Sequence, residues 1–304
     1  MRLRMFLKMF HVEHLFYIVI YFFAKVIVKL NTLYYNDVQD NLKRRRSNVG
    51  KAIAIFNQKG GVGKTTTNIN LAACLALKGK KVLILDIDPQ GNTTSGVGIS
   101  KRELEVTTHE ILIEEDYHPE EAIIPTGIDN LDIMPASVQL AGAEVELIEL
   151  AGREKRLKRA IDVLRPKYDY IFVDCPPSLG ILTINSLTAV DSVLIPIQCE
   201  FYALEGVSQL MSTIDIVKTN LNPDLEIEGV ILSMFDGRTN LSIQVVEEVK
   251  KYFKEKVYTT VIPRNVRLAE APSYGMPVIQ YDPKSSGAIA YMDFADEFLA
   301  NEEE

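Results

Sequence analysis

Residues 57–67 combine glycines, lysines and hydroxyl side chains in an order that can hold a phosphate group. The apolar stretch 52–56 comes directly before them, and the helical pattern 66–78 follows. In a strand, turn and helix of this kind, the N–H groups of the turn and the helix dipole point at one anion. Lys64 is placed to reach the β- and γ-phosphates of a nucleotide, and the Thr65 hydroxyl is placed to ligate Mg²⁺. The sequence therefore predicts a site for a nucleoside triphosphate and Mg²⁺.

This turn departs from the strict phosphate-loop pattern G-x-x-x-x-G-K-[ST], because Gln58 stands where that pattern has glycine and an extra lysine, Lys59, follows. The arrangement resembles the deviant Walker A motif of the ParA/MinD family of ATPases. The resemblance implies that Lys59 crosses a dimer interface and touches the partner's nucleotide. It also implies an ATP site formed by Lys59, Gly60, Gly61, Val62, Gly63, Lys64, Thr65 and Thr66. A glycine turn that only joins a strand to a helix is the alternative.

Two further strand-like runs end in carboxylates. The run 81–86 ends at Asp86 and is followed by Asp88, and the run 169–174 ends at Asp174. A carboxylate near a γ-phosphate can position the attacking water, and an acid at a strand end can support Mg²⁺ directly or through water. By resemblance to the family, Asp88 orients this water, Asp174 is the Walker B acid, and Asp86 is a supporting acid at the metal, either as a ligand or through a neighbouring group. A solvated Asp-Pro turn is the alternative at Asp88.

The resemblance continues through three more stretches of the chain. The string Asp-Cys-Pro-Pro-Ser at 174–178 matches the ParA type, and so do residues 196–206 and 262–273. In the family, the loop matching 262–264 builds part of the adenine pocket, which implies that Pro263 and Asn265 bind nucleotide. The likeness covers nearly all of residues 49–304, which are identified as a Soj/ParA-type ATPase domain of chromosome or plasmid partitioning.

The body of the chain alternates strand-like and helix-like segments. Near-continuous Val, Ile and Leu runs are typical of strands buried on both faces of a parallel sheet. The alternation predicts one doubly wound α/β domain, a mostly parallel sheet with helices on both faces, with ligands at the carboxyl ends of the strands. The strand-like runs are 51–56, 81–86, 130–134, 169–174, 192–197, 228–234 and 257–262; the helical patterns are 65–78, 137–149, 152–164, 203–219, 241–254 and 287–299.

The three cysteines at positions 74, 175 and 199 contain no C-x-x-C pair. Their spacing argues against a disulfide framework and a zinc site, and fits a reducing cytoplasm. An iron–sulfur reductase with a similar phosphate loop needs two suitable cysteines in each subunit. Cys175 lies near one such place, but residues 75–174 contain no second cysteine. We therefore do not expect that class.

Residues 1–48 differ from the rest of the chain. They hold nine basic and three acidic residues, whereas the remainder holds 24 basic and 38 acidic residues. The apolar run 15–24, extended by residues 26–28, is shorter than the ~20 residues that span a bilayer. No small-residue cleavage site follows it. We hypothesise that residues 1–48 are translated upstream sequence and that the native protein begins at Val49; a membrane-associating extension or a disordered tail are the alternatives.

An acidic body can contact DNA only through a local patch. By resemblance to Soj-type proteins, Arg238 and Arg267 contact DNA without sequence preference, as arginine forks suit phosphate oxygens. Acids lie between the lysines of 241–254, so an ordinary solvated helix face is the alternative there. The resemblance implies an ATP-dependent homodimer that coats non-specific double-stranded DNA, is nucleoid-associated in the cytoplasm, and releases DNA when a ParB-type partner triggers hydrolysis.

A membrane-associated ATPase of the MinD type, which places the division site, is the competing function. That class ends in a basic amphipathic helix, whereas this chain ends in acidic residues at 302–304. Anionic lipid would repel these acids. We therefore expect no membrane partner unless the hydrophobic N-terminal segment belongs to the native protein.

Overall fold

The computed structural model describes residues 49–303, apart from residue 103 and residues 201–204. The described residues from Gly50 onward belong to one compact unit. The interpretation of residues 1–48 as translated upstream sequence falls outside the described residues. Within the part of the chain that is described, no helix is both long enough and apolar enough to cross a membrane.

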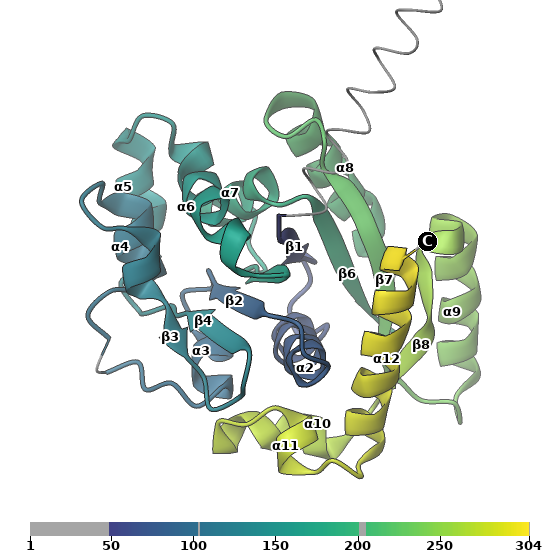
Figure 1. The fold of residues 1–304 in the computed structure, drawn as a ribbon. Coiled ribbons are helices and arrows are strands. Elements are labelled where there is room, and N and C mark those ends of the chain that lie inside the picture. Colours follow the sequence, from purple (N-terminus) through teal and green to yellow (C-terminus); the bar gives the residue numbers. More distant parts are fainter. Residues whose placement is uncertain (1–48, 103, 201–204, 304) are drawn as a thin grey trace, which may run out of the picture. The chain divides into compact units, whose positions relative to one another are not determined.

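The described residues form one eight-stranded sheet (Figure 1). The strand order is β3-β4-β2-β5-β1-β6-β7-β8, and all neighbouring strands run parallel except β3 and β4. The predicted strands are confirmed, and the two-residue β3 is an addition. The strands are β1 (Lys51–Ile55), β2 (Val82–Asp86), β3 (Ile124–Pro125), β4 (Leu131–Met134), β5 (Tyr170–Asp174), β6 (Ser192–Gln198), β7 (Glu226–Phe235) and β8 (Val257–Pro263).

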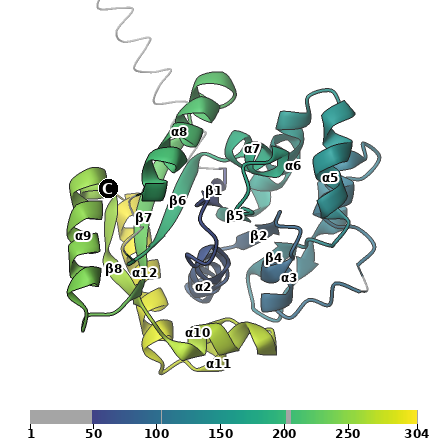
Figure 2. The same ribbon diagram turned by 180° about the vertical axis from the view of Figure 1, so that it is seen from behind.

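Helices cover both faces of this sheet, as the two opposite views show (Figures 1 and 2). One face carries α2 (Lys64–Leu77), α10 (Val266–Glu270), α11 (Val278–Tyr281) and α12 (Ser286–Glu303). The opposite face carries α4 (Thr108–Ile113), α5 (Leu140–Glu146), α6 (Arg156–Leu164), α7 (Ile181–Ala189), α8 (Glu205–Asn220) and α9 (Asn240–Phe253). The short α3 (Asn92–Gly96) contacts α2. The predicted doubly wound fold is confirmed.

The central strands are buried on both sides, which explains their continuous apolar sequences. In β1, Ala52 and Ala54 belong to one apolar core, and Ile53 and Ile55 belong to the core on the other face. Successive side chains of a strand point to opposite faces, so both sets must be apolar here. The sheet therefore separates two cores, and helix α12 closes one of them with Phe294 and Phe298, both fully buried.

The register of three central strands positions the candidate site. Ile55 at the end of β1 pairs with Asp174 at the end of β5, and Asp174 also pairs with Asp86 at the end of β2. Parallel strands end at the same edge of the sheet. The glycine-rich turn after β1 and the two acids therefore meet at one edge, as the sequence predicts.

The described helices differ from the expectations in their bounds, and several were not expected at all. The expected helix 137–149 contains α5 followed by a 3₁₀ turn, Leu147–Glu149, and the expected helix 152–164 begins as the 3₁₀ turn Arg153–Lys155. The first residues of the expected helix 203–219 fall outside the described residues. The expected helix pattern lacked α3, α4, α7, α10 and α11. Most of these are short, and α7 is buried on nearly all sides, with polar residues such as Thr183, Asn185 and Ser186 among the buried ones, so its sequence shows no clear apolar periodicity.

Candidate active site

The turn between β1 and α2 has the conformation that a phosphate cradle needs. Gly61 and Gly63 have positive φ angles of 76° and 92°, which residues with a side chain rarely adopt. A Cβ atom added at Gly61 would meet nothing within 4 Å, so this side of the turn is open. The Ser233 hydroxyl donates to the Val62 carbonyl at 2.7 Å and ties the turn to β7. Because α2 begins directly after the turn, its first N–H groups are available to an anion.

Lys64 is the first residue of α2, and it is 7% exposed. Its Nζ donates to the carbonyl oxygen of Lys59 at 3.1 Å. Burial lowers the pKa of Lys64, and the charge of nearby Asp174 opposes this shift. Thr65 and Thr66 follow in the first turn of α2 and are half-buried. The predicted phosphate-binding groups therefore lie together at the start of one helix.

Asp174 has the features of an acid that supports a metal ion. Its Oδ2 accepts hydrogen bonds from the hydroxyls of Thr65 and Thr93, each at 2.7 Å. Its Oδ1 is buried and has no hydrogen-bond partner. Burial raises the pKa of Asp174 to about 6. Mg²⁺ prefers oxygen ligands and is held by one or two protein groups together with nucleotide phosphates, so the Thr65 hydroxyl and Asp174 fit this ion.

The described residues contain no group of three or more His, Cys, Asp or Glu side chains that could hold a metal alone. Mg²⁺ would therefore depend on the phosphates of the nucleotide for its remaining ligands. Thr93 was not among the predicted site residues. Its place five residues after Asp88 was the only signal in the sequence that could have pointed to it.

Asp86 is fully buried, and its hydrogen bonds hold the segment that follows it. Its Oδ2 accepts from the N–H and the hydroxyl of Thr94, at 2.8 and 2.7 Å, and its Oδ1 accepts from the N–H of Asp88 at 3.2 Å. Burial, with the charge of Asp174 as a second cause, raises the pKa of Asp86 to about 7. Both oxygens are engaged, which suits a supporting acid better than a direct metal ligand; the metal role of Asp86 stays a prediction.

Asp88 lies beside the same group of charges. It is 9% exposed, and its Oδ1 accepts from the N–H of Gln90 at 2.9 Å. Its charge contributes to the pKa shifts of Lys64 and Asp174, which places it near both. This location is compatible with the predicted task of orienting a water at the γ-phosphate.

Lys59 lies at the outer side of the turn and is partly exposed. Its Nζ is 3.6 Å from Oε2 of Glu200, and the other oxygen of Glu200 accepts from Gln198 and lies 3.9 Å from Arg264. Glu200 was not a predicted site residue. It follows β6, which pairs with β1, and only this long-range pairing brings it to Lys59. Its place within the matching stretch 196–206 was the one available signal.

Pro263 and Asn265, the predicted contacts of the base, lie where β8 ends. Pro263 pairs with Phe235 of β7, and the backbone N–H of Arg264 donates to the Phe235 carbonyl at 3.1 Å. The side chain of Asn265 caps α10 by accepting from the N–H of Arg267 at 2.7 Å, and it donates to the Ser286 hydroxyl at 2.7 Å. The loop is thus fixed between β7, α10 and α12.

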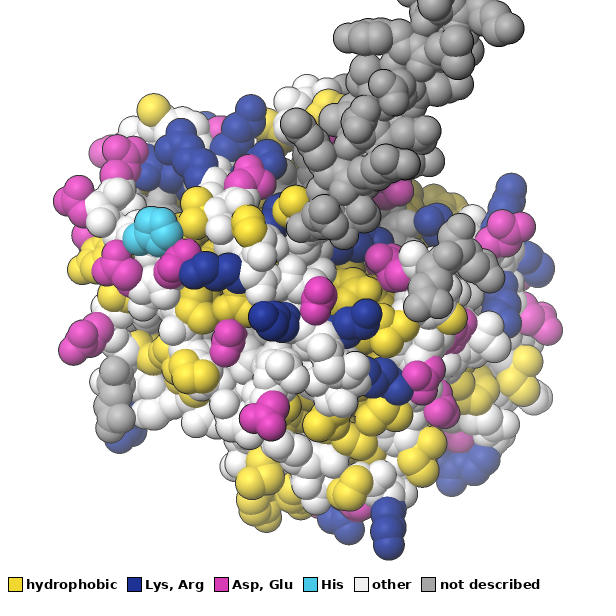
Figure 3. All heavy atoms as spheres, viewed as in Figure 1, with side chains coloured by type: hydrophobic (Ala, Val, Ile, Leu, Met, Phe, Trp, Pro, Cys, Tyr) yellow, Lys and Arg dark blue, Asp and Glu magenta, His cyan; other side chains and the backbone are white. Residues whose placement is uncertain are grey.

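The two predicted DNA-contacting arginines lie on different elements. Arg238, which is 88% exposed at its side chain, follows β7 and forms a fork with Asp236, with bonds of 2.8 and 2.6 Å. This pair lowers the pKa of Asp236 to about 2. Arg267 on α10 bonds Glu270 at 2.8 Å and Asp282 at 3.2 Å. No contact between the two arginines is found, and basic and acidic side chains are interleaved on the face in Figure 3.

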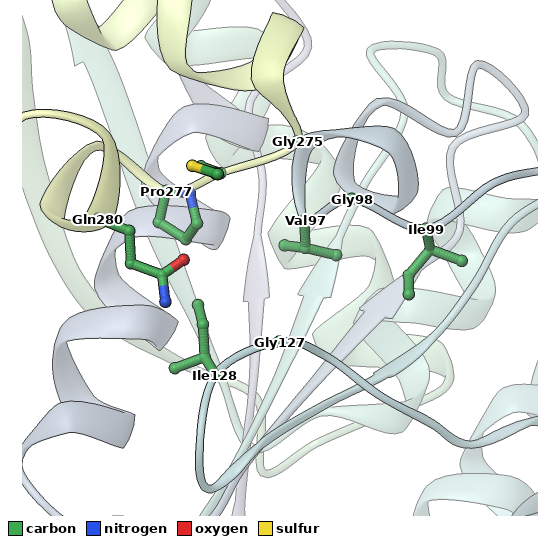
Figure 4. A pocket seen from close by; sticks show the side chains of 9 residues that line it. Val97, Gly98, Ile99, Gly127, Ile128, Gly275, Pro277 and Gln280 are labelled. Carbon is green, nitrogen blue, oxygen red and sulfur yellow. The ribbon is translucent and has the colours of Figure 1, made fainter.

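A pocket of about 570 Å³ is lined by residues that are not among the predicted site residues (Figure 4). Three loops form it: the segment after α3, the turn before β4, and the segment around α11. At its edge the backbones of Gly98 and Gly275 are in close contact: a Cβ added at Gly275 would lie only 2.6 Å from the Cα of Gly98. The lining residues are Val97, Gly98, Ile99, Gly127, Ile128, Gly275, Met276, Pro277 and Gln280.

Comparisons with known proteins agree with this site. Residues 50–227 match a family model described as an AAA domain. The chain is 62% identical over 253 residues to the sporulation initiation inhibitor protein Soj of Bacillus subtilis, covering 83% of this chain and all of that protein. It is 53% identical over 257 residues to the chromosome partitioning protein ParA of Myxococcus xanthus, covering 84% and 90% of the two chains.

A solved structure shares the arrangement as well. The cobyrinic acid a,c-diamide synthase of Mycobacterium smegmatis, with bound ATP analogue and magnesium, is 40% identical, with a TM-score of 0.74 over 84% of this chain and 96% of that one. The expected relationship is thereby confirmed. With its glycine turn, second lysine and buried acids at one edge of a parallel sheet, this chain belongs to the Soj/ParA family of chromosome-partitioning ATPases.

Proposed function

We propose that this protein is an ATP-dependent dimeric switch that binds DNA non-specifically and partitions chromosome or plasmid DNA with a ParB-type centromere-binding protein. The observation that carries the proposal is the position of Lys59. It lies at the open side of the phosphate turn, partly exposed, with one described acid, Glu200, at 3.6 Å. A lysine placed there is available to a nucleotide held by a second copy of the chain.

Each nucleotide-facing residue has a task in this proposal. The turn N–H groups and Lys64 bind the phosphates, and Thr65 and Asp174 hold Mg²⁺. Mg²⁺, when bound, neutralises charge on the β- and γ-phosphate oxygens. Asp88 orients the attacking water and can accept its proton late in the reaction. Asp86 keeps Asp88 in place through the hydrogen bond from the Asp88 N–H.

Dimerisation is the step that couples ATP to DNA in this proposal. A single chain offers Arg238 and Arg267 and few other phosphate contacts, so it binds DNA weakly. Two chains joined through their nucleotides offer twice as many contacts. The logarithm of the binding constant then falls by about 0.9 per phosphate contact for each logarithmic unit of salt, so the dimer gains both affinity and salt sensitivity. Hydrolysis, stimulated by the partner, separates the two chains and releases the DNA. The protein therefore stays on the nucleoid, in the cytoplasm, only while ATP is bound.

The C-terminal helix supports this function over a membrane-bound one. Most of the large apolar side chains of α12, including Tyr291, Phe294 and Phe298, are buried against the core, and Ile289 is the exposed exception among its described residues. An interfacial helix needs an apolar face that is free to enter lipid. The end of α12 is also acidic, and Glu302 pairs with Lys51 at 2.6 Å.

A DNA-binding assay tests the proposal. The full chain is mixed with random-sequence duplex DNA in the presence of ATP or ADP, and binding is followed by gel shift at several salt concentrations. We expect a shift with ATP and Mg²⁺ and little with ADP. Lys59→Ala should keep nucleotide binding but lose the ATP-dependent dimer, measured by light scattering, and with it the DNA shift. Equal DNA binding with ATP and ADP would contradict the proposed switch.

A further inference from the structure

Thr93 connects the helix after Asp88 to the acid at the end of β5. Its side chain is fully buried, and its hydroxyl donates to Oδ2 of Asp174 at 2.7 Å. The amide of Asn68, on α2, donates to the same hydroxyl oxygen at 3.3 Å. Thr93 thus accepts from the phosphate-loop helix and donates to the acid.

The two threonines of α3 bond different acids. Thr93 bonds Asp174, whereas Thr94 bonds Asp86 through both its N–H and its hydroxyl. Helix α3 begins after Gly91, which has a φ angle of 60°, and it has no side-chain cap of its own. These bonds to the two acids therefore help to fix its position, together with its packing against α2 and the 3₁₀ turn Ala271–Tyr274.

The bond from Thr93 also determines which oxygen of Asp174 remains available. Thr65 and Thr93 both donate to Oδ2, while Oδ1 is buried and unpartnered. Two donors on one oxygen oppose rotation of the carboxylate about its side-chain bond. A carboxylate so held keeps its other oxygen free for a metal ion or a metal-bound water. Partners of this kind, which orient a metal-supporting group, typically change metal affinity by 10- to 100-fold when they are removed.

We propose that Thr93 is a positioning residue for Mg²⁺·nucleotide binding. It holds Asp174 in the orientation that serves the metal, and it ties that acid to the segment that carries Asp88. The inference rests on the nucleotide switch proposed above, and it adds a residue that neither the phosphate-loop pattern nor the strand-end acids indicate. Thr93 acts through Asp174 and does not itself touch the nucleotide.

Nucleotide binding without turnover provides the test. A fluorescent ADP analogue is titrated with the full chain, first in EDTA and then at increasing Mg²⁺. Thr93→Val keeps the shape of the side chain and loses its hydroxyl. We expect it to raise by about 10-fold the Mg²⁺ concentration that gives half of the Mg²⁺-dependent gain in affinity for the ADP analogue. Affinity in EDTA should change little. Thr93→Ser, which keeps the donor, should stay within about 3-fold of the unmodified protein, since the remaining hydroxyl still bonds Asp174.

Thr108→Val is the matched control. Thr108 is also fully buried, and its hydroxyl donates to the backbone carbonyls of Asp86 and Pro135 at 2.8 and 3.1 Å. This variant loses a buried hydroxyl and is expected to lower the melting temperature without the 10-fold change in Mg²⁺ requirement. If Thr93→Val does not fold, Thr93→Ala replaces it in the same titration.

Two outcomes would overturn the inference: an unchanged Mg²⁺ requirement in the hydroxyl-free variant, or a loss in Thr93→Ser as large as in Thr93→Val. Failure of the proposed switch would look different. In that case the unmodified protein itself would show no difference between ATP and ADP in DNA binding, whatever the behaviour of the Thr93 variants.

Discussion

The nucleotide end of the sheet differs in burial and charge pairing from the segment around β7 and α10, which carries the two arginines proposed to contact DNA. At the nucleotide end, Asp86 and Asp174 are buried and accept several short hydrogen bonds from α2 and α3. Around β7 and α10, Arg238 and Arg267 are exposed and paired with neighbouring acids. The first region fixes geometry, and the second leaves positive charge available to a partner that can displace a carboxylate.

This difference has an energetic consequence. Exposed ion pairs contribute about 0–1 kcal/mol, and salt screens them. A DNA phosphate can therefore replace Asp236 or Glu270 at small cost. Removing one partner from a buried charged group costs more, about 1–3 kcal/mol or above. Changes at the nucleotide end should accordingly have large and specific effects, whereas changes at the arginines should have graded and salt-dependent effects.

The largest effect is expected from Lys64→Ala. The variant loses the buried amine that we propose to reach the β- and γ-phosphates, so ATP binding should fall below detection in a calorimetric titration. Lys78→Ala is the control, because Lys78 is at the end of the same helix and pairs with Asp296 on the surface. Measurable ATP affinity within 10-fold of the unmodified protein would remove Lys64 from the site.

Asp88→Ala comes next. Loss of a group that positions the water typically lowers the rate by 10²–10⁴-fold; we expect phosphate release to fall by at least about 100-fold while ATP binding persists. The protein should then remain on DNA as an ATP dimer. Turnover at the normal rate would show that another group activates the water.

The double variant Arg238→Glu with Arg267→Glu tests the other region. DNA affinity at low salt should fall by about 10-fold or more, and the salt dependence should become shallower because fewer phosphates are contacted. ATP-dependent dimerisation should persist in light scattering. The control is Lys158→Glu with Lys167→Glu, which makes the same change in charge at a partly exposed position on α6 and an exposed position after it. If this control weakens DNA binding equally, the net charge of the protein is responsible and not the two arginines.

The smallest effect concerns pH. The pKa of Asp86 is raised to about 7 and that of Asp174 to about 6, against 3.8 for a free Asp side chain. The folded state therefore binds more protons than the unfolded state between about pH 4 and 7, so stability falls as pH rises through this window. Asp236, whose pKa is lowered to about 2, contributes stability that is lost only below about pH 4.

Without nucleotide and Mg²⁺, the melting temperature should therefore drop by about 5 °C between pH 5 and 7.5. Asp86→Asn should flatten this drop, because a neutral amide does not titrate. A melting temperature that rises over the same interval in the unmodified protein would contradict the assigned pKa shifts.

The sequence predicted the strands and the acids at their ends, but it did not predict every residue that contacts them. Continuous apolar runs located the central strands, since strands such as β1 and β5 are buried on both faces. The meeting of Asp86 and Asp174 at one edge of the sheet followed from the rule that parallel strands end at the same edge. Glu200 and Thr93 could not be predicted in the same way: Glu200 reaches Lys59 only through the pairing of β6 with β1, and Thr93 reaches Asp174 only because a five-residue helix forms there.

The contact between Gly98 and Gly275 limits how this protein can vary. The loop after α3 and the loop that follows the 3₁₀ turn Ala271–Tyr274 touch through bare backbone, and both glycines have positive φ angles. A methyl group at position 275 would lie 2.6 Å from the Cα of Gly98, and one at position 98 would lie 3.0 Å from the carbonyl oxygen of Gly275. Natural divergence and engineering should therefore treat the two glycines as a pair, and any longer side chain introduced at one of them would have to force these loops apart.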